Sequence, residues 1–198
     1  GPVWNPMALN RSTFSRALNG RTLRFIGDSL TLDHYQYLTR CVLGCKFEDM
    51  RTGTIDISLA KQSKAAFDRD LTSAGYSADA RFWAHLILRQ AAGKDGWARG
   101  CKLEGGGLID FRRFNSLPAN TTRPGGGSYR EILAATLHAL MRWPAPSLRR
   151  DDVVVLNLGL HEGPDLYEKM MDVLNWWRGE GERAPYLLWR QGSPQHWQ

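Results

Sequence analysis

The segment at 152–158, Asp-Val-Val-Val-Leu-Asn-Leu, constrains the fold more than any other part of the sequence. Its unbroken apolar run is typical of a central strand that is covered on both faces, as the strands of parallel sheets are. We therefore expect a sheet with helices packed against both of its faces.

Further strands and helices alternate along the chain. Strands are expected at 21–26, 81–88, 108–114 and 186–190, and helices at 29–44, 128–143 and 164–177, with 55–71 either helix or loop. The segments 91–107 and 118–127 are rich in Gly, Pro, Asn and Thr, which predicts surface loops. The alternation predicts an α/β fold with an open, mostly parallel sheet.

The composition is that of one globular domain. Of the 198 residues, 42% are hydrophobic, 23% are charged and 11% are aromatic, which argues against disorder. No apolar run approaches the roughly 18 residues of a membrane-spanning helix. We expect a single domain over 3–198, after an opening Gly1-Pro2 that resembles the scar of a cleaved expression tag.

The charge pattern gives no sign of a nucleic-acid partner. The chain has 26 Lys and Arg against 20 Asp and Glu, a net charge of +6, but the basic residues are scattered as singles and pairs. No zinc, RNP or P-loop pattern accompanies them. Three cysteines without a Cys-x-x-Cys motif and five dispersed histidines also predict no metal and no cofactor.

The cysteines and two glycosylation sequons bear on the compartment. Cys41 and Cys45 are one helical turn apart and Cys101 is distant, so one of the three thiols lacks an internal partner. In a reducing cytosol all three would be small buried side chains, whereas in an oxidising lumen the odd one would pair outside this sequence. The sequons at 10–12 and 120–122 fit the lumen of the secretory pathway, such as the Golgi, or secretion.

A Gly-Asp-Ser sequence joins the first predicted strand to the first predicted long helix. In a parallel sheet such a turn lies at the carboxyl end of the strand, where sites form. The hydroxyl of a serine there is exposed, and its N–H points to where the helix dipole favours negative charge. An acyl-transfer nucleophile needs both features, because its reaction develops an oxyanion. Ser29 is therefore a candidate nucleophile; the alternative is an N-cap serine that only satisfies helix amides.

Other segments extend this pattern. They are Trp4-Asn5-Pro6, Phe14, the run 18–30 that ends in Gly-Asp-Ser-Leu, Tyr35–Leu38, Cys41, the run 151–161 and the run 188–197 with its Arg-x-x-Ser-Pro-x-His-Trp sequence. Over 4–45 and 150–197 the chain resembles the PC-esterase branch of the GDSL/SGNH hydrolase superfamily. That branch includes the trichome-birefringence-like plant wall polysaccharide O-acetyltransferases and the animal sialate O-acetyltransferase. The middle of the chain matches it poorly.

The resemblance implies a three-layer SGNH-hydrolase-like sandwich around a central, mostly parallel sheet. It also implies that Ser29 is the nucleophile and that its N–H is an oxyanion donor. The residues expected to line the same pocket are Gly27, Asp28, Asn157, Gly159 and His161.

One family motif is missing from this sequence. In the family, the general base and its orienting acid come from an Asp-x-x-His motif, and that spacing does not occur after residue 161. His196 has Ser193 three positions before it, in a segment that precedes the catalytic pair in the relatives. Three arrangements could supply the base: a missing carboxyl-terminal segment that completes the triad, a second chain that does so, or His196 itself. We expect the missing segment. Without a base a serine hydroxyl is a weak nucleophile.

The remaining histidines are expected to be structural. His34 and His138 fall on predicted helices and would be solvated or structural, and His85 falls on a predicted strand and would be a core histidine.

Three functions fit these observations. The first is acyl (acetyl) transfer or ester hydrolysis on a glycan through an acyl-Ser29 intermediate, with a polysaccharide or other glycan and an acyl donor as partners. The second is a non-catalytic glycan-binding or structural module on the same fold, which the absent Asp-x-x-His would permit. The third is a lipase or thioesterase of the wider superfamily. We prefer the first.

Overall fold

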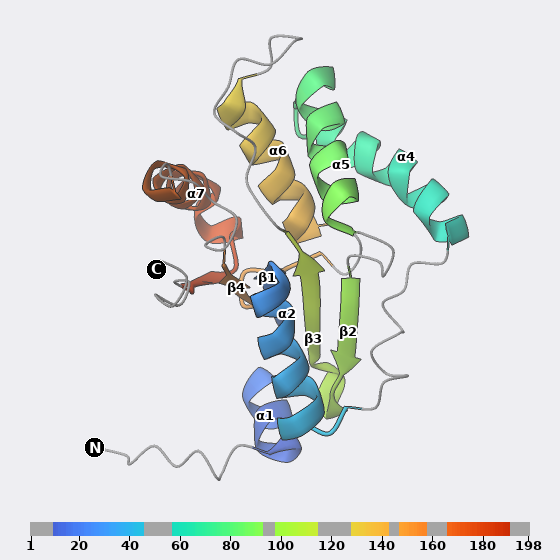
Figure 1. The fold of residues 1–198 in the computed structure, drawn as a ribbon, viewed down its shortest axis with the longest axis vertical. Coiled ribbons are helices and arrows are strands. Elements are labelled where there is room, and N and C mark those ends of the chain that lie inside the picture. The colour runs from blue at the N-terminus through green and yellow to red at the C-terminus, as the bar shows by residue number, and fades with distance from the viewer. Residues whose placement is uncertain are drawn as a thin grey trace.

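The computed structural model describes residues 10–45, 57–92, 98–114, 128–142, 147–157 and 166–190. These ranges form an α/β fold around a five-stranded mixed sheet with the strand order β2-β3-β1-β4-β5 (Figure 1). The fold class predicted from the alternation of elements is therefore confirmed at this level. Among the described residues, no helix is both long and apolar enough to cross a membrane.

The sheet is parallel except at one edge. Its strands are β1 (Thr22–Gly27), β2 (Ala98–Lys102), β3 (Leu108–Arg113), β4 (Val153–Leu156) and β5 (Tyr186–Trp189). β1 pairs in parallel with both β3 and β4, β4 pairs in parallel with β5, and β2 is antiparallel to β3. The carboxyl ends of four strands therefore lie along one edge of the sheet, which we call the carboxyl edge.

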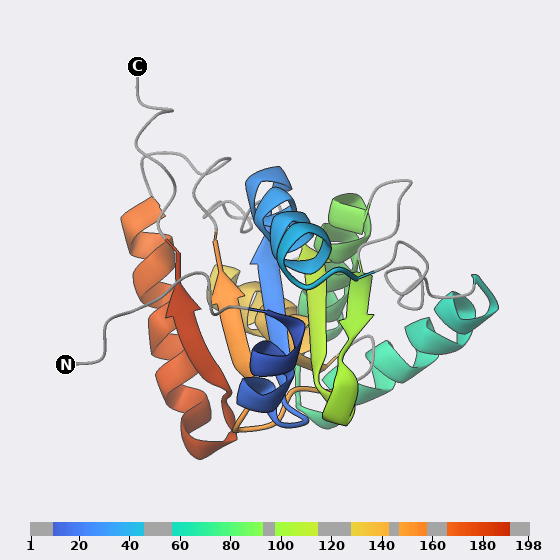
Figure 2. The same cartoon turned by 90° about the horizontal axis from the view of Figure 1, so that it is seen from below.

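Helices flank both faces of the sheet. They are α1 (Arg11–Leu18), α2 (Ser29–Gln36) with the π-helical turn η2 (Tyr37–Val42), α4 (Ile57–Ser73), α5 (Ala78–Ala92), α6 (Tyr129–Arg142) and α7 (Leu166–Glu180), with short 3-10 turns η3 (Glu104–Gly106) and η4 (Gly181–Arg183). α1 and α2 lie over one face, and α5, α6 and α7 lie over the other (Figure 2).

The alternation of side chains along β1 supplies both cores. Leu23 and Phe25 belong to the core under α2, where the buried ring of Tyr35 packs against Phe25 at a centroid distance of 6.1 Å. Ile26 points to the opposite face and joins the larger core under α5, α6 and α7. Helices therefore cover both faces of the central strand, as is typical of parallel sheets.

A charged network lies inside the larger core. Arg24 on β1 is 0% exposed, and its Nη2 lies 2.8 Å from Oδ2 of Asp110 at the paired position of β3. Its Nη1 donates to the carbonyl oxygens of Leu140 and Met141, at 2.9 and 3.0 Å, in the last turn of α6. A helix end has carbonyls without intrahelical partners, so this guanidinium both caps α6 and ties it to two strands.

Arg112 completes the network on β3, with its Nη2 3.0 Å from the same carboxylate. Burial alone would raise the pKa of Asp110, but Arg112 and Arg24 hold that pKa below its usual value. Burial lowers the pKa of Arg112 to about 10, although Asp110 opposes this effect. Asp110 and Arg112 therefore stay charged near neutral pH, and the carboxylate is the counter-charge that both buried guanidinium groups share.

Most predicted elements are confirmed, with shifted ends. The strands predicted at 21–26, 108–114, 152–158 and 186–190 correspond to β1, β3, β4 and β5. Of the segment 55–71, predicted as either helix or loop, the described residues 57–71 are helical in α4. The helix predicted at 29–44 is α-helical only to Gln36 and continues as the π-helical turn η2. The helices predicted at 128–143 and 164–177 correspond to α6 and α7, of which α7 runs on to Glu180.

The strand predicted at 81–88 is wrong, because these residues belong to α5. Ser77 accepts a hydrogen bond from the Ala80 amide at 3.2 Å, which caps the start of the helix. Ala80 and Ala84, four residues apart, are both fully buried. A short apolar run fits a strand or a buried helix equally well, and here the helical spacing decides.

The loop predicted at 91–107 is also wrong in part, because it contains β2 and η3. β2 is a short edge strand that carries Gly100 and pairs with β3 alone. Edge strands are often short and polar, so they give little apolar signal. The loop predicted at 118–127 lies outside the described residues.

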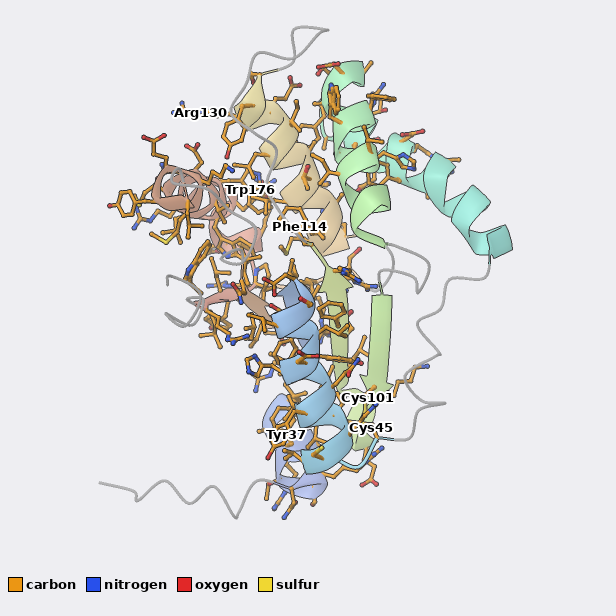
Figure 3. The ribbon with its side chains drawn as sticks, in the orientation of Figure 1. Tyr37, Cys45, Cys101, Phe114, Arg130 and Trp176 are labelled. Carbon is orange, nitrogen blue, oxygen red and sulfur yellow. A yellow bond between two sulfur atoms is a disulfide. The ribbon has the colours of Figure 1, made fainter. Side chains whose placement is uncertain are left out.

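The structure also answers the cysteine question left open by the sequence. Cys45, just after η2, forms a disulfide with Cys101 on β2 (Figure 3). Cys41 is a free and exposed thiol. The bridge joins positions 56 residues apart. Closing a loop of that length is worth about 4 kcal/mol in the chain-entropy model.

The Asp110→Asn variant tests the buried network. Removing the carboxylate charge leaves two buried guanidinium groups without a counter-charge, so we expect the free energy of unfolding to fall by about 3 kcal/mol or more, measured by urea denaturation. The control is Asp172→Asn, whose carboxylate lies 3.8 Å from the largely exposed Arg130; this change should cost less than about 1 kcal/mol. Equal losses in both variants would contradict a stabilising role for the network.

His138 provides a pH-dependent contribution to stability. Burial lowers the pKa of His138 below 6.5, and Arg142 lowers it further, although Asp70, whose Oδ2 lies 3.1 Å away, opposes the shift. As the pH falls through 6.5, the unfolded chain therefore takes up a proton that the folded chain resists. We expect the free energy of unfolding to decrease over this range, and the slope to become shallower in His138→Gln. An unchanged slope in the variant would contradict this assignment.

Candidate active site at the carboxyl edge of the sheet

The turn between β1 and α2 contains a residue that caps the helix and, directly after it, a serine with an exposed side chain. Asp28 is the N-cap of α2: its Oδ1 accepts a hydrogen bond from the Thr31 amide at 3.1 Å, and the residue is 1% exposed. Because Asp28 caps the helix, Ser29 is the first helical residue, and it is exposed. The alternative in which Ser29 is itself the N-cap is therefore wrong.

Gly27 is required by close packing at this turn. A Cβ at this position would collide with the Thr31 side chain and would lie 2.9 Å from the carbonyl oxygen of Asn157. The absence of a side chain lets the end of β1 approach the start of α2 and the end of β4 at the same point.

Asn157, at the end of β4, lies against the turn between β1 and α2. It follows the last residue of that strand, its amide donates to the carbonyl oxygen of Ile26 at 3.0 Å, and it is 1% exposed. The structure therefore brings Gly27, Asp28, Ser29 and Asn157 together, as the sequence predicts.

The carboxyl edge also contains two residues that were not predicted as site residues. Arg190 follows β5; its amide donates to the carbonyl oxygen of Leu156 at 2.9 Å, and its Nη2 lies 3.5 Å from Nε2 of His34 on α2. Burial lowers the pKa of His34 below 6.5 and Arg190 lowers it further, although Asp33 and Asp28 oppose the shift. The imidazole is therefore neutral at pH 7. Two signals in the sequence could have indicated Arg190: its position at a strand end and its place at the start of the Arg-x-x-Ser-Pro-x-His-Trp sequence.

Three predicted site residues, Gly159, His161 and His196, lie outside the described residues. Of the histidines within the described ranges, His138 is buried against Asp70 and the ring of His85 packs against Phe67 at 5.6 Å. His85 is on α5, so its predicted strand position is wrong. No described residue forms a hydrogen bond with the Ser29 hydroxyl, and the described part of the chain holds no cluster of three or more potential metal ligands.

The chemistry available at this point follows from the helix start. The first backbone N–H groups of a helix have no acceptor within it, and the macrodipole makes that end positive. Ser29 therefore offers a hydroxyl as nucleophile and its own amide as a donor for an oxyanion. Such donors stabilise developing charge by roughly 3 kcal/mol each when they are prearranged.

Gly27→Ala tests the packing of the turn. The added methyl group must displace Thr31 or the carbonyl of Asn157, so we expect a loss of about 1–3 kcal/mol in the free energy of unfolding, measured by urea denaturation. The matched control is Gly179→Ala near the end of α7, where a Cβ meets nothing within 4 Å. Alanine is the better helix former, so this control should be neutral or stabilising. A neutral Gly27→Ala would show that the turn is looser than described.

No family model matches the chain, and neither a curated protein nor a solved structure matches it.

Proposed function

We propose that this protein is a serine-dependent acyltransferase or esterase that acts on O-acyl groups of a glycan, on a three-layer fold of the SGNH-hydrolase type. One observation carries the proposal: Asp28 caps α2, which leaves the hydroxyl of Ser29 exposed at the positive end of the helix. The resemblance of the sequence around this turn to the PC-esterase branch supports acetyl as the acyl group.

The reaction has two halves. The Ser29 oxygen attacks the carbonyl carbon of an ester, a base takes the hydroxyl proton, and the bond to the leaving alcohol breaks as that alcohol takes up a proton. The acyl-Ser29 ester then passes its acyl group to water in hydrolysis or to a sugar hydroxyl in transfer. The Ser29 amide and a polar group at Asn157 would stabilise the oxyanion in both halves.

The base is the least defined participant. Two candidates fit this role: an Asp-x-x-His pair supplied by a further segment or a second chain, as the family motif implies, and His196. The disulfide between Cys45 and Cys101 supports an oxidising compartment, and hence a secretory or extracellular glycan as the substrate.

The central test is acetylation by 4-nitrophenyl acetate, followed by intact mass and peptide mapping. We expect a single acetyl adduct on the peptide that contains Ser29, and a fall of about 10²-fold or more in release of nitrophenol in Ser29→Ala. Ser128→Ala is the matched control, because Ser128 is an exposed serine that accepts from the Glu131 amide at the start of α6. Equal rates in wild type and Ser29→Ala would refute the proposal.

His196→Gln separates the two sources of the base. If His196 is the base, this variant acylates more slowly and loses the pH dependence of the wild-type rate near neutrality. An unchanged rate and profile would assign the base to the alternative pair.

A non-catalytic glycan-binding module is the second candidate. It rests on the sequence, in which the Asp-x-x-His spacing of the family does not occur after residue 161. Binding of a glycan by a protein that forms no acetyl adduct would support this function.

A further inference from the structure

The guanidinium of Arg190 lacks an anionic partner within the described part of the chain. Its Nη1 is shielded from solvent and has no hydrogen-bond partner there. Its Nη2 has one neighbour, Nε2 of His34 at 3.5 Å, a distance too long for a good hydrogen bond. No described carboxylate lies within the 4.0 Å of an ion pair with it.

Arg190 is half-buried, and the two fully buried arginines of the described residues share a counter-charge. Arg24 and Arg112 share the carboxylate of Asp110 at 2.8 and 3.0 Å. Shielding part of a charged group from water also has a cost unless an opposite charge or good hydrogen bonds offset it, and for Arg190 this applies to Nη1. His34 does not provide that offset, because burial and Arg190 itself lower its pKa and keep it neutral.

Arg190 lies on the same edge of the sheet as Ser29. β5 is separated from β1 by β4 alone, so the ends of the two strands are about 10 Å apart, two strand spacings. The contact with His34 shows that the side chain of Arg190 reaches back toward α2, the helix that begins with Ser29. A group held by Arg190 would therefore lie within the length of a small ligand from the nucleophile.

We propose that Arg190 binds an oxyanion of the ligand that reaches Ser29, either the carboxylate of an acidic sugar or a phosphate of the acyl donor. This inference rests on the proposed function for the place of Ser29, and it adds a charged group to the substrate. A guanidinium is suited to this role because its fork of N–H donors matches a carboxylate or phosphate with two parallel hydrogen bonds.

Titration calorimetry tests the proposal with three probes: tri-galacturonate, the neutral tri-galactose, and coenzyme A. We expect wild type to bind at least one anionic probe more tightly than tri-galactose, and Arg190→Gln to weaken that binding by about 10-fold or more. Loss confined to tri-galacturonate assigns the carboxylate, and loss confined to coenzyme A assigns the donor phosphate. Arg190→Lys should recover part of the affinity, because it keeps the charge without the fork.

Arg150→Gln is the matched control. It removes the same charge from an exposed arginine that precedes β4, at the opposite edge of the sheet, so binding should not change. Urea denaturation of Arg190→Gln checks that the fold is retained. Equal binding of both anionic probes by wild type and Arg190→Gln, or no anionic probe bound more tightly than tri-galactose, would overturn the proposal.

Ser29→Ala separates this inference from the proposed function. This variant should lose the acetyl adduct but keep anion binding that depends on Arg190. Anion binding without acylation in wild type would refute the proposed enzymatic function and leave the anion site at Arg190. Acylation without Arg190-dependent binding would support the enzymatic function and refute the anion site.

Discussion

The buried pair of Arg24 and Asp110 is the interaction on which the rest of the structure depends. It joins β1 to β3 at paired positions, and the same guanidinium holds the last turn of α6 through two carbonyl oxygens. The central strand β1, its neighbour β3 and helix α6, which are far apart in the sequence, are thereby held together. Since β1 ends in the turn that carries Ser29, this network also sets where the candidate nucleophile lies.

The candidate site itself depends on a division of roles between neighbours. Asp28 satisfies the start of α2 from a buried position, Gly27 removes the side chain that would separate β1 from β4, and Ser29 is left exposed. Arg190 adds a positive charge from β5 on the same edge. The anionic ester that we propose as substrate would meet a hydroxyl, helix amides and a guanidinium at this one edge.

The residues that could be predicted from the sequence are those whose signal is local. The apolar run of β4 and the Gly-Asp-Ser turn after β1 each lie within a few residues, so strand, turn and exposed serine follow from them. The sequence of α5 predicts a strand because a short apolar run fits both a strand and a buried helix, and β2 has no strand signal because an edge strand needs no apolar pattern. The buried state of Arg24, the Cys45–Cys101 bridge and the place of Arg190 depend on contacts between distant segments, which no local pattern encodes.

The most direct test of this account is the reactivity of Ser29 toward a fluorophosphonate, followed by mapping of the modified peptide. If Ser29 is a nucleophile assisted by the start of α2, it should be labelled about 10²-fold faster than Ser128, which also lies at a helix start but serves there as the cap. Labelling of both serines at the same slow rate, or of neither, would contradict the account.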